Sequence, residues 1–259
     1  MAVITFSLSL TKTIEFSSNV VQIDIAGIIF GLEFGLGTII AFFTALLTAA
    51  GSIWLIMNHP RFVSSGNKWY KALSHMIIPV MSAFIISITL SNMNKGSAWW
   101  ILLGLSIFLL TMVLIAEYNI FDPSGQIHPL AAISLISLTF ALFLVLTITL
   151  RTSDVRLTFV IPLISIAGSL AAARFLYLRA SGKWLVEWVI IIAFIISQVV
   201  IGLHYLNIRP IPYALILFGV LLGLSQLFLG LFKKKRGSSL FAEPLLMIII
   251  VGILVGYFW

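Results

Sequence analysis

Long runs of apolar residues, separated by short polar connections, dominate the pattern along this chain. A transmembrane helix needs about 20 consecutive, mostly apolar residues to cross a hydrocarbon core of about 30 Å. Eight such runs are expected, at residues 34–57, 72–90, 99–116, 130–150, 157–177, 184–205, 213–232 and 240–259. The pattern therefore predicts an all-α, polytopic integral membrane bundle of about eight transmembrane helices.

The first 33 residues do not fit this pattern. Residues 1–18 alternate weakly between polar and apolar positions, which is typical of a short strand or an irregular lead. Residues 20–32 are apolar but too short to span, and Asp24 and Glu33 lie near their ends. We therefore expect residues 1–33 to form an extracytoplasmic lead and an interfacial or re-entrant helix.

The two halves of the chain resemble each other. Segments 50–52, 65–69 and 83–87 recur in the same order as segments 167–169, 181–184 and 193–197. Ser52 and Ser169 are 117 positions apart, and Ser65 and Ser181 are 116 apart. The roughly constant offset predicts a tandem duplication, although chance similarity between apolar spans is the alternative.

The duplication predicts two four-helix membrane repeats, residues 34–150 and residues 151–259. Because each copy has an even number of spans, both copies would cross the bilayer in the same direction. Such parallel repeats are related by an axis along the membrane normal.

Composition agrees with membrane insertion and narrows the classes of function. The chain is 61% hydrophobic and 9% charged, whereas soluble domains are about half apolar and about a quarter charged. Short connections leave no room for a soluble catalytic or nucleic-acid-binding domain. The absence of cysteine excludes disulfides, thiolate catalysis, Cys-ligated zinc and iron–sulfur clusters.

The basic residues predict an orientation. One side of the predicted membrane receives Arg61, Lys68, Lys71, Arg174, Arg179, Lys183, Lys233, Lys234, Lys235 and Arg236. The other side receives Lys12, Lys95, Arg151, Arg156 and Arg209. Positive charge collects on cytoplasmic loops, so we expect the first side to be cytoplasmic and both termini to lie outside, in the cell membrane. The run 233–236 is expected to contact anionic lipid headgroups rather than nucleic acid.

Polar residues within spans are the first candidates for function. Arg174 and Glu187 lie near the same end of neighbouring spans, so they are candidates for a gating pair, with a structural pair or snorkelling side chains as the favoured alternative. Gln198 and Gln226 are candidates for the lining of a polar cavity, with hydrogen bonds between helices as the favoured alternative.

The residue types of metal and catalytic sites are sparse. His75 and His128 are conceivable ligands of a haem or a metal, but no i, i+3 or i, i+4 ligand spacing supports such a site. Glu117, Asp122 and Glu243 are not closely spaced, which disfavours a site of paired carboxylates. We therefore expect no catalytic centre, no metal and no cofactor.

Three classes of function remain. The favoured one is a non-catalytic scaffold or accessory subunit that contacts other membrane subunits. The second is a small transporter with a pathway between the two repeat halves. The third is a membrane anchor that binds a quinone or a haem.

Overall fold

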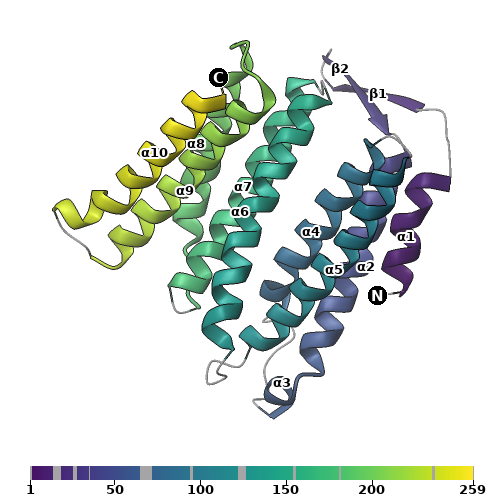
Figure 1. Cartoon of the computed structure of the whole chain (residues 1–259), viewed down its shortest axis with the longest axis horizontal. Helices are drawn as coiled ribbons and strands as arrows, with labels where there is room; N and C mark the ends of the chain where they lie inside the picture. Colours follow the sequence, from purple (N-terminus) through teal and green to yellow (C-terminus); the bar gives the residue numbers. More distant parts are fainter. Residues whose placement is uncertain are drawn as a thin grey trace. The chain divides into compact units, whose positions relative to one another are not determined.

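The computed structural model describes residues 2–13, 19–25, 28–34, 36–64, 72–93, 96–121, 127–153, 156–180, 182–234 and 237–258. Its helices in chain order are α1 (Ala2–Thr13), α2 (Leu36–Met57), α3 (Pro60–Ser64), α4 (Leu73–Ser91), α5 (Ser97–Ile120), α6 (His128–Thr152), α7 (Leu157–Arg179), α8 (Val186–His204), α9 (Pro210–Phe232) and α10 (Ser238–Phe258) (Figure 1). Strands β1 (Asn19–Ile25) and β2 (Ile28–Phe34) lie between α1 and α2 in the sequence.

The predicted fold class is confirmed. Within the described ranges, eight helices are long and apolar enough to cross a membrane, namely α2 and α4 to α10. Each of them covers one of the predicted apolar runs. α1 has 12 residues and, at about 1.5 Å per residue, is too short to cross.

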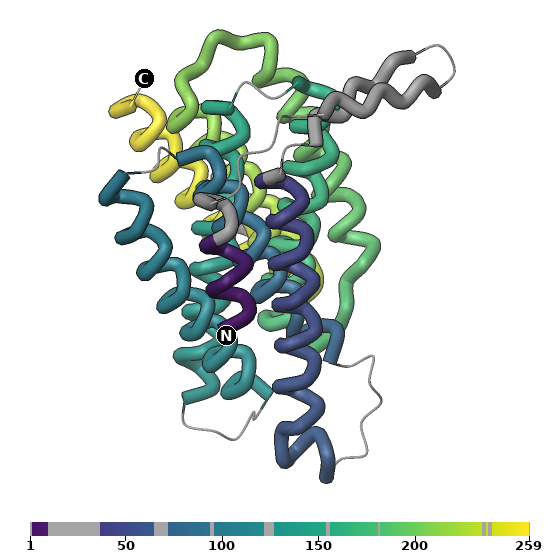
Figure 2. Tube along the Cα trace, turned by 90° about the vertical axis from the view of Figure 1, so that its right-hand side faces the viewer, coloured from purple at the N-terminus to yellow at the C-terminus, as the bar shows by residue number. Residues whose placement is uncertain are grey.

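The N-terminal segment differs from the prediction, because residues 2–13 form a helix instead of a strand or an irregular lead. Ile4 and Leu8, one helical turn apart, are both buried against α4 and α5. The hydroxyls of Ser7 and Thr44 lie 2.7 Å apart and join α1 to α2, which lie side by side (Figure 2). The i, i+4 spacing of these apolar residues explains the helix.

Residues 19–34 also differ, because the expected interfacial or re-entrant helix is an antiparallel β-hairpin. Its register pairs Asn19 with Phe34 and Ile25 with Ile28. The segment is rich in β-branched residues, and its polar positions Gln22 and Asp24 alternate with apolar ones. Both features favour a strand over a helix.

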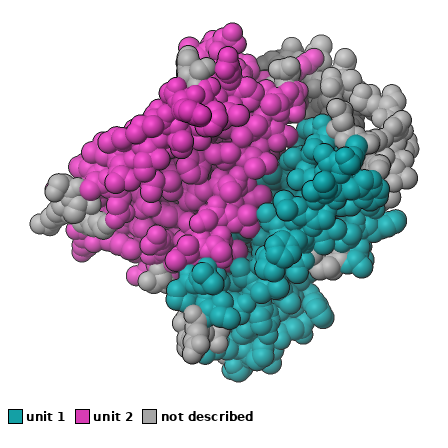
Figure 3. Space-filling view, in the orientation of Figure 1, with its two compact units in different colours: residues 1–131 teal, residues 132–259 magenta. Residues whose placement is uncertain are grey.

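The chain forms two compact units, residues 1–131 and residues 132–259 (Figure 3). Of the eight candidate spans that the described residues contain, unit 1 holds α2, α4 and α5, and unit 2 holds most of α6 and all of α7 to α10. The expected division into residues 34–150 and residues 151–259 therefore does not coincide with the compact units, and the boundary falls in α6. The tandem duplication stays a prediction.

The core of unit 1 forms where α1, α4 and α5 meet. Trp99 is 1% exposed and packs with Leu90 and Leu103. Its indole N–H donates to the carbonyl of Leu90 over 3.2 Å. The bond gives the indole N–H a partner inside the apolar core, and it ties the start of α5 to the end of α4.

The core of unit 2 is organised around α9, which packs against α7, α8 and α10. Leu217 and Leu221 of α9 are completely buried. A Cβ placed on Gly168 of α7 would lie 3.3 Å from Phe143 of α6 and 3.8 Å from Leu221. A glycine at this position lets the helices approach closely, as in many membrane bundles.

The contact between α9 and α10 generates a test. A Cβ on Gly219 would lie 2.8 Å from Cγ1 of Val251, whose branched side chain is stiff. Gly219→Ala should lower the free energy of unfolding in detergent by about 1–3 kcal/mol through overpacking. The matched control is Gly223→Ala on the same helix, where the new Cβ would lie 3.8 Å from Ile248. Equal thermal stability of both variants would contradict this close packing.

Candidate functional site

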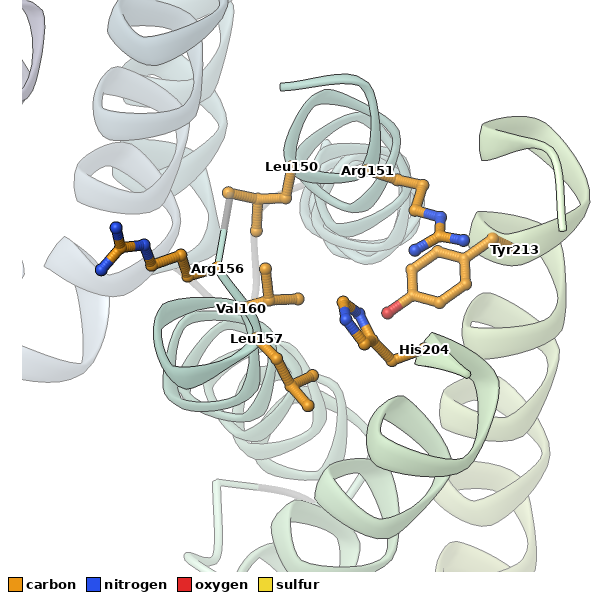
Figure 4. Close-up of a pocket in the computed structure, with 7 residues that line it drawn as sticks. All are labelled: Leu150, Arg151, Arg156, Leu157, Val160, His204 and Tyr213. Atoms are coloured by element: carbon orange, nitrogen blue, oxygen red, sulfur yellow. The ribbon is translucent and has the colours of Figure 1, made fainter. Parts of the chain in front are cut away.

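A pocket of about 200 Å³ lies within unit 2, where α6 and α8 end and α7 and α9 begin. Residues from all four helices and the adjoining turns line it, namely Leu150, Arg151, Arg156, Leu157, Val160, His204 and Tyr213 (Figure 4). The apolar members come from α6 and α7. The polar members place cationic and hydroxyl groups at the end of the spans.

Arg151, in the last turn of α6, is held in a defined position. Its Nη2 donates to the carbonyl of Leu206 over 3.2 Å and to that of Ile208 over 3.4 Å. Its guanidinium carbon lies 5.1 Å from the centre of the Tyr213 ring, within the range of a cation–π contact. These contacts join the end of α6 to the α8–α9 turn and to the first turns of α9.

Tyr213 and His204 complete the polar side of the pocket. Tyr213 is 1% exposed, and Figure 4 shows its hydroxyl beside the imidazole of His204. Neither side chain makes a hydrogen bond to the residues that the structure describes. The phenol and the imidazole therefore keep their hydrogen-bonding capacity for a group that enters the pocket.

The pocket carries positive charge. No aspartate or glutamate lines the pocket in the described part of the chain, and Asp154, which precedes α7 in the sequence, lies outside that part. Figure 4 shows the guanidinium of Arg156 pointing away from Tyr213, so Arg151 is the cation beside the polar groups. Guanidinium, phenol and imidazole can all donate hydrogen bonds, which suits them to holding an anion.

A second polar cluster lies in unit 1, at the ends of α4 and α5. Nδ1 of His75 lies 2.8 Å from Oε2 of Glu117 in a buried hydrogen bond. The side chains are 8% and 1% exposed. A buried carboxylate and a buried imidazole each need a hydrogen-bond partner in an apolar surrounding, and this bond supplies one to Oε2 of Glu117 and one to Nδ1 of His75.

Aromatic rings enclose this cluster. The ring centre of Phe121 lies 5.5 Å from that of His75 and 5.1 Å from that of His59. His59 also lies 4.4 Å from the ring of Tyr118. The aromatic contacts and the His75–Glu117 bond connect the α2–α3 turn, α4 and α5, so the cluster stabilises one end of unit 1.

The structure places Arg174 and Glu187 in different surroundings. Arg174 is completely buried in α7, with its guanidinium carbon 5.5 Å from the centre of the Tyr177 ring. Glu187 is exposed in the first turn of α8. The burial of one side chain and the exposure of the other give no support to a shared gating pair.

The other predicted site residues are dispersed. Gln198 is exposed on α8, and Gln226 is half-buried on α9. Lys233 and Lys234 are exposed, whereas Lys235 and Arg236 lie outside the described residues. The two glutamines therefore do not share one environment, and the two described lysines are accessible to headgroups.

The histidines weighed for a haem or metal have separate surroundings as well. His75 is buried and bonded to Glu117, and His128 is half-buried at the start of α6. Among the described residues, no three histidine, aspartate or glutamate side chains lie close enough together to hold a metal ion.

Sequence reasoning missed both polar clusters. His75 and Glu117 are 42 positions apart, and Arg151 and Leu206 are 55 apart. A signal for the pocket exists in hindsight, because Arg151, Arg156 and Arg209 fall on the side expected to be poor in positive charge. Positive charge usually collects on the cytoplasmic side, so basic residues on the other side are candidates for ligand binding.

The His75–Glu117 bond generates a test. Glu117→Ala should lower the free energy of unfolding by about 1–3 kcal/mol, because buried His75 loses its partner. Glu117→Gln keeps a side-chain carbonyl that can accept the hydrogen bond, so it should lower the free energy of unfolding by less than Glu117→Ala. Thermal unfolding in detergent measures both. The control is Glu187→Ala at an exposed position, and an equal effect of Glu117→Ala and Glu187→Ala would show that the bond contributes nothing.

Comparison with known proteins identifies a family. Residues 16–258 match a protein-family model described as "Protein of unknown function (DUF5656)". No curated protein and no solved structure matches the chain. Because the family description names no activity, the geometry of the chain carries the functional argument.

Proposed function

The chain belongs to this family, and from its structure we propose that it is a non-catalytic scaffold or accessory subunit of a membrane complex, joined to a partner subunit through α10. The observation that carries the proposal is the surface of α10. Only 11% of its spanning window is buried, compared with 61% for α4. α10 therefore presents most of its surface to lipid or to another transmembrane helix.

The exposed surface of α10 has the residue pattern of a helix–helix contact. Gly252 and Gly256 are both exposed, and a Cβ on either would meet no atom within 4 Å. Residues four apart lie on the same helix face, and a Gly-x-x-x-Gly pair on an apolar helix lets a second backbone approach closely. Ile249 and Ile253 flank this pair and are 61% and 68% exposed.

Another face of α10 is already occupied. Val251 is 7% exposed and packs onto Gly219 of α9. The helix therefore packs on α9 along one face, and its face with Gly252 and Gly256 is exposed. This arrangement supports an accessory subunit, because one helix can be fixed to its own bundle while it binds a neighbour.

Basic residues gather at the end of unit 2 where α7 and α9 finish. Arg179, Lys183, Lys233 and Lys234 are exposed there. The ammonium of Lys183 lies 6.0 Å from the centre of the Phe232 ring, which places the α7–α8 turn beside the end of α9. This cluster supports a cytoplasmic location for that end, against the anionic headgroups of the cell membrane.

The transporter and cofactor-anchor alternatives have less support. A transporter needs polar side chains that converge within the spans, and Gln198 is exposed while Gln226 is half-buried. A haem anchor needs an available histidine, and His75 is engaged with Glu117.

The proposal predicts a crosslink from α10. A photoreactive amino acid at Ile253 should crosslink in native membranes to another membrane subunit, which mass spectrometry identifies. Gly252→Leu with Gly256→Leu should reduce that crosslink by about tenfold, because added side chains hold the partner backbone away.

The matched control for this experiment is Gly202→Leu on α8. Gly202 is also exposed, and a Cβ there would also meet no atom within 4 Å. The control should leave the crosslink unchanged. Crosslinks to lipid alone would contradict the proposal, and crosslinks only to a second copy of the chain would replace the accessory subunit with a homodimer.

A further inference from the structure

We infer that the pocket formed by Arg151, His204 and Tyr213 binds a phosphate group at the membrane surface, supplied by a lipid headgroup or by a free phosphate anion. The inference does not depend on the role proposed for α10. It rests on the pocket residues of unit 2.

The donors of the pocket approach a shared space from different helices. Arg151 comes from the end of α6, His204 from the end of α8 and Tyr213 from the start of α9. The carbonyls of Leu206 and Ile208 engage Nη2 of Arg151. Its Nη1 and Nε groups make no hydrogen bond within the described part of the chain, so they remain available to an anion.

Tyr213 is the most specific indication of a ligand. It is 1% exposed, and its hydroxyl has no hydrogen-bond partner among the described residues. The hydroxyl is not one of the fully buried side-chain atoms that lack a partner, so it opens into the pocket, where it can donate to a ligand. A phosphate oxygen between this hydroxyl and Arg151 would satisfy both groups.

The size and charge of the pocket narrow the ligand class. A volume of about 200 Å³ is smaller than the range typical of sites for drug-sized molecules, which is about 300–1,000 Å³. The space therefore suits a small group instead of a whole cofactor. Arginine donates two parallel hydrogen bonds to phosphate with good geometry, and the bonds are stronger because both partners are charged.

The position of the pocket along the helices allows both sources of phosphate. Arg151 and His204 stand in the last turns of α6 and α8. The ends of spans lie at the level of the polar headgroups, just outside the hydrocarbon core. Leu150, Leu157 and Val160 line the apolar side of the pocket, where the first carbons of a lipid could lie.

Two binding arms test the inference on the purified, delipidated full-length protein. In the first, native mass spectrometry compares dioleoyl phosphatidate with dioleoylglycerol, which has the same acyl chains and lacks the phosphate. In the second, equilibrium dialysis measures the binding of radiolabelled inorganic phosphate. Retention of phosphatidate alone assigns a headgroup site, and binding of inorganic phosphate assigns a site that also accepts the free anion.

The decisive variant is Tyr213→Phe, which removes the hydroxyl and keeps the ring beneath Arg151. It should lower the affinity for the ligand by about tenfold or more, because a hydrogen bond to a charged group is lost. Its thermal stability should not fall. Arg151→Gln should abolish binding. Because it also removes the hydrogen bonds to Leu206 and Ile208, its thermal stability should fall too, which is why Tyr213→Phe is the deciding variant.

The matched control is Arg156→Gln, which removes a positive charge at the same end of the bundle from a side chain that points away from Tyr213. It should change binding by less than about twofold, as expected for an exposed charge. Equal losses in Tyr213→Phe and Arg156→Gln would overturn the inference. So would equal retention of phosphatidate and dioleoylglycerol combined with no binding of inorganic phosphate.

Discussion

The rest of the structure depends on the need to hydrogen-bond every polar group that enters the hydrocarbon core. Water is absent there, so the backbone forms helices and polar side chains must find partners within the protein. Many hydroxyls inside the spans meet this constraint by donating to the carbonyl four residues earlier, whereas those of Ser87 and Ser165 are buried without a hydrogen bond to the described residues. Bonds to the carbonyl four residues earlier are made by Thr48, Ser82, Thr139, Thr147 and Ser225.

The same constraint explains where the chemistry is found. Hydroxyls can be satisfied inside one helix at any depth, but larger or charged groups need partners from other elements. His75 and Glu117 meet near the ends of α4 and α5. Arg151 meets the α8–α9 turn. Both polar clusters therefore lie near helix ends, where the spans approach water and headgroups.

The eight spans could be predicted from the sequence because their signal is local. A run of about 20 apolar residues has few other stable structures in a membrane protein. The short segments before α2 gave no such signal. Residues 2–13, 19–25 and 28–34 are short and carry weak, competing patterns, and the structure assigns them to α1, β1 and β2.

The site could not be predicted because its pairings depend on how each helix is rotated and which neighbour it packs on. The sequence marks Arg174 as a charged residue near the end of a span, but it does not show that Arg174 is buried in α7 while Glu187 is exposed. In the sequence, Tyr213 is one aromatic residue among many. Its burial beside Arg151 emerges only when α6, α8 and α9 are assembled.

The central claim is that eight helices cross the membrane. It is tested most directly by finding the face of the membrane on which each connection between helices lies. The chain has no cysteine, so single cysteines can be introduced and labelled with a maleimide that cannot cross the membrane. One set of sites is Ser64, Ile127, Lys183 and Lys233, and the other set is Met93, Ser153 and Asn207. Eight spans predict that the first set is labelled only from one face and the second set only from the other. Labelling of two successive connections from the same face would contradict the account.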